Sequence, residues 1–109
     1  MEKEIEEKIN KLSMMEQNSQ YLASQRQNFQ NQLLEVESAM EELDIAEESY
    51  KIIGSVMVKV DKKKLKKDLE EKKKIIDVRV QTIEKQEDKL KESSKELRDE
   101  VMSGLEKEQ

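Results

Sequence analysis

The stretch of sequence that decides the fold is Tyr50-Lys51-Ile52-Ile53-Gly54-Ser55-Val56-Met57-Val58-Lys59-Val60. Two short runs of β-branched residues meet there at a Gly-Ser pair, whereas the flanking chain consists mostly of Glu, Lys, Gln and regularly spaced aliphatic residues. This pattern predicts a β-hairpin. Every second residue after the turn is a valine, which gives the second strand one β-branched face, and Gly54 supplies the positive φ that a tight turn needs.

A hairpin of this size needs partners, because an isolated pair of strands is only marginally stable in water. We therefore expect the apolar residues of the hairpin, together with the turn glycine, to form an assembly surface. These residues are Tyr50, Ile52, Ile53, Gly54, Val56, Met57, Val58 and Val60.

Composition favours long helices over a compact globule. Only 34% of the 109 residues are hydrophobic and 3% are aromatic, whereas 43% are charged, which is too few apolar residues for a core of ordinary thickness. Disorder is the competing interpretation, but the apolar residues recur at heptad spacing among strong helix formers. Proline is absent and the only glycines are Gly54 and Gly104, so helices are interrupted only in the middle and near the C-terminus.

The residue types also exclude several function classes. The sequence has neither Cys nor His, which removes thiolate chemistry, sulfur ligands for metals and the commonest general base, so we expect no enzyme, metal or cofactor. The first residues lack an apolar signal core, and no stretch approaches the roughly 20 apolar residues of a membrane span, so we expect a cytoplasmic protein without a membrane partner. A net charge of −5 argues weakly against a phosphate backbone as the main partner.

The first helix is expected over residues 1–44, with a heptad repeat that weakens in its middle. Its two sets of core positions are Ile5, Leu12, Ser19, Arg26, Leu33 and Met40, and Lys8, Met15, Leu22, Phe29, Val36 and Leu43. Ile9 is expected to replace Lys8 in the interface. Ser19 and Arg26 fall within the Gln-rich stretch 17–32, which we interpret as a polar section of coiled coil, with a Gln-lined site as the alternative.

The second helix is expected over residues 61–107, with Asp61 as its N-cap. Lysines at 62–64 oppose the helix dipole there. The heptad is clear at Leu69, Ile76, Ile83, Leu90 and Leu97, and its companion positions are more polar. A narrow apolar stripe favours a two-helix coiled coil. The predicted fold is mainly α: a long antiparallel two-helix coiled coil, with arms on the order of 60 Å, with one β-hairpin (49–60) between the helices.

Two segments resemble a known family. Tyr50-Lys51-Ile52-Ile53-Gly54-Ser55-Val56-Met57-Val58-Lys59 and the later Thr82-Ile83-Glu84-Lys85-Gln86-Glu87 are similar to the beta-class subunit of prefoldin, and the resemblance extends over essentially the whole chain. The alpha class has two hairpins between its helices, but only about 16 residues separate the helices here, enough for one hairpin. The beta class is therefore favoured, and residues 1–109 are expected to form a single prefoldin-like domain.

The resemblance implies an ATP-independent chaperone. It implies a hexamer of two alpha-class and four beta-class subunits whose hairpins assemble into β-barrels, with coiled-coil arms that hold non-native polypeptides at their tips. The clients would pass to a group II chaperonin.

Apolar residues near both chain ends are candidates for the client-binding tips. These are Ile5, Ile9, Leu12, Met14, Val101, Met102 and Leu105. Flexible thioether side chains suit the binding of diverse partners. The alternative is that these residues close the coiled coil, which has about equal weight for Ile5, Leu12 and Val101, whereas client contact is favoured for the others.

Two other functions compete with the chaperone. A structural coiled-coil adaptor with one defined partner would form a stable homodimer and would not suppress aggregation. A nucleic-acid-binding helical hairpin would use the lysines between 59 and 74, but acidic residues interrupt this run and no aromatic residue lies within it, so we expect no nucleic-acid partner.

Overall fold

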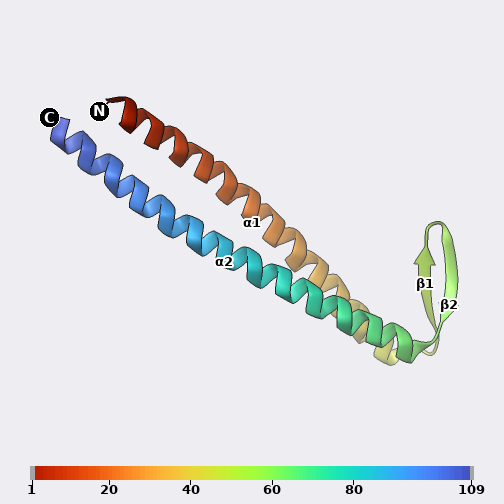
Figure 1. The fold of residues 1–109 in the computed structure, drawn as a ribbon. Coiled ribbons are helices and arrows are strands. Elements are labelled where there is room, and N and C mark those ends of the chain that lie inside the picture. Colours follow the sequence, from red (N-terminus) through yellow and green to blue (C-terminus); the bar gives the residue numbers. More distant parts are fainter. Residues whose placement is uncertain (1, 109) are drawn as a thin grey trace. The chain divides into compact units, whose positions relative to one another are not determined.

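The computed structural model describes residues 2–108, and the side chains of residues 2–107, as two helices joined by a hairpin. The elements are α1 (Glu2–Ile45), β1 (Ser49–Ile53), β2 (Val56–Val60) and α2 (Lys62–Glu108) (Figure 1). The predicted fold class is therefore confirmed. Helix α1 ends one residue beyond the predicted position. Asp61 occupies the N-cap position of α2, where its carbonyl oxygen accepts from the Leu65 N–H at 3.0 Å.

The chain divides into two compact units, which we describe separately. The hairpin unit is Asn28–Val80, and the terminal unit combines Met1–Gln27 with Gln81–Gln109. In each unit, segments of α1 and α2 lie side by side in opposite directions (Figure 1).

The hairpin unit contains a continuous apolar core between its helices. Val36, Ile76 and Val80 are buried, and four half-buried residues pack around them: Phe29, Leu33, Met40 and Leu69. The Arg79 guanidinium lies 5.5 Å from the centre of the Phe29 ring, a cation–π distance. All seven core residues are heptad positions, so the predicted spacing determines which face of each helix is buried.

Two lysines of α2 provide partners for polar groups at the C-terminal end of α1. The Lys62 ammonium donates to the backbone carbonyls of Asp44 at 3.2 Å and Ala46 at 2.9 Å, and Lys66 forms an ion pair with the Asp44 carboxylate at 3.3 Å. Cations are favourable at a helix C-terminus, where the last carbonyls lack intrahelical partners. The interpretation of Lys62 as simply opposing the dipole of its own helix was therefore incomplete.

In the terminal unit, the segments of α1 and α2 pair through a more varied set of side chains. Ile83 and Val101 are buried, and the Ser94 hydroxyl donates to the Met15 sulfur at 3.4 Å. The expectation that Ile9 replaces Lys8 in the interface is wrong. Ile9 is 47% exposed, whereas Lys8 is half-buried and forms an ion pair with Glu100 at 3.4 Å, because its long stem can cover apolar surface while the ammonium reaches an acidic partner.

Candidate assembly hairpin and helix ends

The hairpin carries exposed apolar side chains on both faces. Ile52 is 69% exposed, Met57 65%, and Ile53 and Val56 58% each. Tyr50 and Val58 are also exposed, and Val60 is half-buried. A monomeric protein rarely exposes so dense a set of apolar side chains, so this surface is suited to a partner.

The strand register assigns these residues to two faces. Ser49 pairs with Val60, Lys51 with Val58 and Ile53 with Val56, so these six side chains share one face, which we call the valine face. Tyr50 pairs with Lys59 and Ile52 with Met57, which forms the opposite face. The alternation predicted after the turn is therefore present.

The turn is a two-residue Gly-Ser loop between Ile53 and Val56. Gly54 has a φ of +62°, as predicted, whereas no other described residue has a positive φ. Glycine alone at the first central position is typical of a type II′ turn, whose twist matches that of the two strands. An added Cβ at Gly54 would meet no atom within 4 Å, so glycine is required there by backbone conformation and not by space.

Polar contacts fix the base of the hairpin. The buried Ser49 hydroxyl donates to the Val60 carbonyl at 2.9 Å. The exposed Tyr50 hydroxyl donates to the Glu48 carboxylate at 2.6 Å, and Lys59 lies 3.4 Å from the same carboxylate. The hydrogen bond from the Tyr50 hydroxyl is the larger cause, and the contact with Lys59 the smaller, that holds the pKa of Glu48 below its ordinary value. The hydrogen bond to Glu48 also raises the pKa of Tyr50.

A groove of about 500 Å³ lies at the base of the hairpin, within the hairpin unit. Its apolar wall combines side chains from α1, the connection after it, β1 and α2: Ala39, Leu43, Ala46, Ile52, Leu65 and Leu69. Tyr50 and Glu48 also line it. Tyr50 and Ile52 of the face opposite the valine face therefore border the groove, and the valine face contributes only its polar residues Ser49 and Lys51 to the lining.

The predicted tip residues fall into two groups in the terminal unit. Ile5 and Leu12 are half-buried and Val101 is 6% exposed, so these three contribute to the helix interface. Four others are exposed: Ile9 (47%), Met14 (65%), Met102 (58%) and Leu105 (44%). This is the division that heptad position suggested, and it leaves thioether and aliphatic surface available on the arm.

An ion pair within the helix interface was not predicted. Arg26 Nε lies 2.7 Å from Glu87 Oε1, and both atoms are shielded from solvent. Arg26 is an expected core position of the first helix and Glu87 falls at one of the more polar companion positions of the second, but neither repeat indicates which positions face each other.

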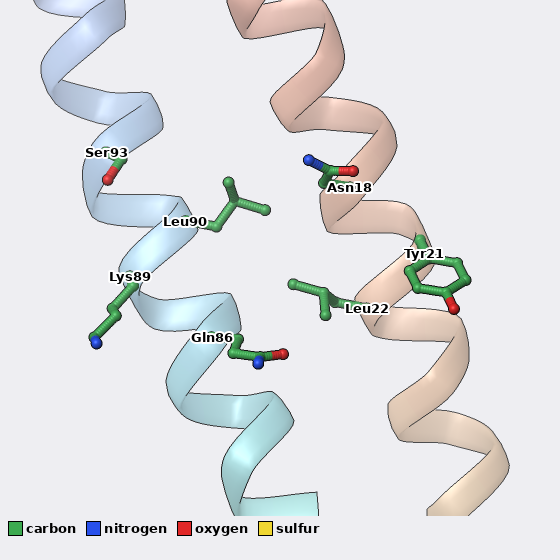
Figure 2. A pocket seen from close by; sticks show the side chains of 7 residues that line it. All are labelled: Asn18, Tyr21, Leu22, Gln86, Lys89, Leu90 and Ser93. Carbon is green, nitrogen blue, oxygen red and sulfur yellow. The ribbon is translucent and has the colours of Figure 1, made fainter.

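The Gln-lined site considered for residues 17–32 is not what the structure shows. A groove of about 430 Å³ includes part of this stretch, but its lining residues are Asn18, Tyr21, Leu22, Gln86, Lys89, Leu90 and Ser93 (Figure 2). The single glutamine among them comes from α2. Gln25 instead donates to the Tyr21 hydroxyl at 2.8 Å, one helical turn away.

Neither helix, over its described length, contains a segment long and apolar enough to cross a membrane. Residues 2–108 likewise contain no group of three acidic side chains arranged to hold a metal ion.

Comparisons with known proteins agree with this architecture. The sequence profile of the family described as "Prefoldin subunit" matches residues 6–108. The prefoldin subunit beta of Thermococcus onnurineus is 34% identical over 105 residues, covering 94% of this chain and 90% of the relative. That of Thermoplasma volcanium is also 34% identical, covering 85% of this chain and 78% of the relative.

A solved structure gives the same result in three dimensions. The crystal structure of the prefoldin beta subunit from Thermococcus strain KS-1 matches with a TM-score of 0.87 at 31% identity, covering 94% of this chain and 92% of the other. One hairpin between two long helices, the matched profile and these relatives together show that this chain belongs to the prefoldin family, as a beta-class subunit.

Proposed function

We propose that this chain acts as an ATP-independent chaperone that assembles through its hairpin, holds non-native polypeptides at its helix ends and delivers them to a group II chaperonin. Family membership makes the chain a non-enzymatic, prefoldin-type chaperone subunit that assembles with other prefoldin subunits. The proposal adds a hexamer of two alpha-class and four beta-class subunits, a cytoplasmic location and a single functional domain over residues 1–109. It includes no nucleic-acid partner.

The observation that carries the assembly proposal is the hairpin with two exposed apolar faces. Its register leaves one outer edge of each strand unpaired within the two-stranded sheet. Unpaired edges are templates for further strands, and burial of apolar residues contributes roughly 25 cal/mol per Å². Joining hairpins from several subunits would give the unpaired strand edges hydrogen-bond partners and would bury the apolar faces.

The client-binding proposal rests on the exposed group at the helix ends. Ile9, Met14, Met102 and Leu105 add little to the pairing of the helices because their side chains are largely in solvent. They are suited to contact with irregular apolar segments of unfolded chains. Several arms acting on one client would multiply weak contacts through avidity.

The test replaces Ile9, Met14, Met102 and Leu105 together by Ser and measures suppression of aggregation of a denatured client. We expect normal assembly and a strong loss of protection. The matched control replaces four exposed polar residues of the same helix segments by Ser, namely Lys3, Asn10, Asp99 and Glu106, and should protect like the wild type. Full protection by the variant that lacks the four apolar residues would show that the tips do not bind clients. Failure of both the wild type and the control variant to protect would favour the structural adaptor.

A further inference from the structure

One side of the terminal unit has an open groove with a leucine floor. Leu22 of α1 and Leu90 of α2 point toward each other across it, and Asn18 and Tyr21 lie along the α1 wall (Figure 2). Tyr21 is 62% exposed, although it is one of only three aromatic residues in the chain. A large exposed ring beside a leucine floor is apolar surface that the pairing of the two helices does not bury.

A second groove of about 320 Å³ lies nearer the helix ends on the same side. It is lined by Glu4, Glu7, Lys8, Lys11, Leu97 and Glu100. Along α1, Lys11, Met14, Asn18 and Tyr21 follow at steps of three and four residues, which places them on one helix face. Met14, which is 65% exposed, therefore lies between the two grooves and connects them along α1.

The opposite side of the same segment has a different chemistry. Its groove, of about 310 Å³, is lined mainly by charged residues, including Glu16, Glu87, Asp88, Lys91 and Arg98. The Tyr21 groove has one charged residue among its lining residues, Lys89, and its other polar groups are neutral. Seating an apolar side chain would require desolvation of many charges on one side and of few on the other.

We propose that the Tyr21 groove is a second client subsite, adjoining the exposed Met14, which takes an extended segment of non-native polypeptide with an aliphatic or aromatic side chain on the Leu22–Leu90 floor. This inference rests on the proposed client-binding function and adds a place and a preference to it. The client surface on this side then runs along the arm from Met14 to Tyr21, whereas Ile9 and Leu105, each seven residues from Glu16 or Arg98 of the charged groove, lie toward the other side.

The lining residues indicate which segments fit. Asn18, Gln86 and Ser93 can donate to and accept from the backbone of an extended chain without desolvating a charge. Lys89 adds one positive charge at the rim, which disfavours cationic side chains next to the seated residue and favours acidic ones. The preferred segment is apolar with neutral or acidic neighbours.

The first experiment compares three variants of the full chain within the assembled complex, by affinity for reduced, carboxymethylated α-lactalbumin, which cannot refold. Tyr21→Gln removes the ring and should weaken binding about tenfold per engaged site. Tyr21→Phe keeps the ring and should bind within twofold of the wild type. Ser19→Gln changes an exposed residue that lines the opposite, charged groove and should also leave affinity unchanged.

The second experiment locates the client by photo-crosslinking from single positions. A photoreactive residue at Lys89 should crosslink to the client, whereas one at Lys91, which lines the charged groove, should not. A third position, Leu105, reports the helix ends. Crosslinks from Leu105 without any from Lys89, or equal crosslinks from Lys89 and Lys91, would overturn the subsite while leaving the tips in place. Crosslinks from none of the three would contradict client binding by the arm itself.

Discussion

The hairpin unit and the terminal unit are built from the same two helices, yet they fill their helix interfaces differently. In the hairpin unit, Val36, Ile76 and Val80 are each no more than 9% exposed and belong to one apolar core. In the terminal unit, the interface includes the Arg26–Glu87 ion pair, and grooves open on both sides of Leu90.

This difference shows that a heptad repeat specifies which face is buried without specifying how well it is packed. Heptad positions occupied by Leu, Ile, Val or Phe bring apolar surface together and exclude water. Where the same positions carry Ser, Arg or Glu, the helices remain paired but space opens beside them. The hairpin unit thus has a continuous apolar core, and the terminal unit has the grooves in which we propose that clients bind.

The largest expected effect separates the roles of the two units. Val58→Asp places a charge on the valine face of the hairpin and should abolish assembly, while most helical content remains. Ile9→Asp, at an exposed position of the terminal unit, should assemble normally. Gel filtration combined with circular dichroism measures both. A Val58→Asp variant that still forms the full-size complex would mean that the valine face is not part of the assembly.

The next comparison truncates one interface residue in each unit. Ile76→Ala, at a site that is 4% exposed, should lower the free energy of unfolding by about 3 kcal/mol because it leaves a cavity in a packed core. Leu90→Ala, flanked by open grooves, should cost about 1.5 kcal/mol. Urea unfolding of the two variants measures both losses in the free energy of unfolding. Equal losses would show that the terminal unit is as tightly packed as the hairpin unit.

The ion pair provides a test within the terminal unit. Glu87→Leu leaves Arg26 without its partner and should cost about 1 to 2 kcal/mol, a figure reduced from that of a fully buried pair because both side chains are partly exposed. Arg26→Leu combined with Glu87→Leu should recover the loss or exceed wild-type stability. A double-mutant cycle by urea unfolding measures the coupling. A value near zero would mean that the 2.7 Å contact does not stabilise the interface.

The two glycines should respond with opposite signs. Gly54→Ala forces an alanine into φ +62° and should destabilise the hairpin unit by about 1 kcal/mol. Gly104→Ala adds a Cβ that would lie 3.4 Å from the Ile5 side chain, an ordinary contact, and should stabilise the end of α2 by up to about 1 kcal/mol. Thermal unfolding distinguishes them. A destabilising Gly104→Ala would indicate that Ile5 cannot accommodate the added methyl group.

The smallest effect is a pH dependence confined to the hairpin unit. The folded-state pKa of Glu48 is lowered, so the contribution of Glu48 to folding stability is present above the ordinary carboxyl pKa and is lost as pH falls through the lowered value. The folded-state pKa of Tyr50 is raised, so its contribution is present below the ordinary phenol pKa and is lost as pH rises through the raised value. In a Tyr21→Phe background, ultraviolet titration should show a raised pKa for Tyr50, and Glu48→Gln should return it toward the ordinary value.

The sequence predicted most of the fold because the relevant signals are local. Hairpin residues are β-branched with a central glycine, and α2 repeats an aliphatic residue every seventh position, so each pattern depends on nearby residues alone. What it could not predict is how α1 and α2 match across the interface. The pairs Lys8–Glu100 and Arg26–Glu87 follow from the alignment of two segments far apart in sequence, which no single-helix pattern contains.

The position of the hairpin also sets the order in which the chain can fold. Contacts at its base join residues close in sequence: Ser49 bonds Val60 across 11 positions, and Lys62 reaches Ala46 across 16. The Ser94–Met15 contact in the terminal unit closes a separation of 79. Since the entropy cost of closing a loop grows with its length, we expect folding to nucleate at the reversal and to proceed along the helices as a zipper. The surface that we propose holds other unfolded chains would then be the last part of this chain to fold, and the first to open.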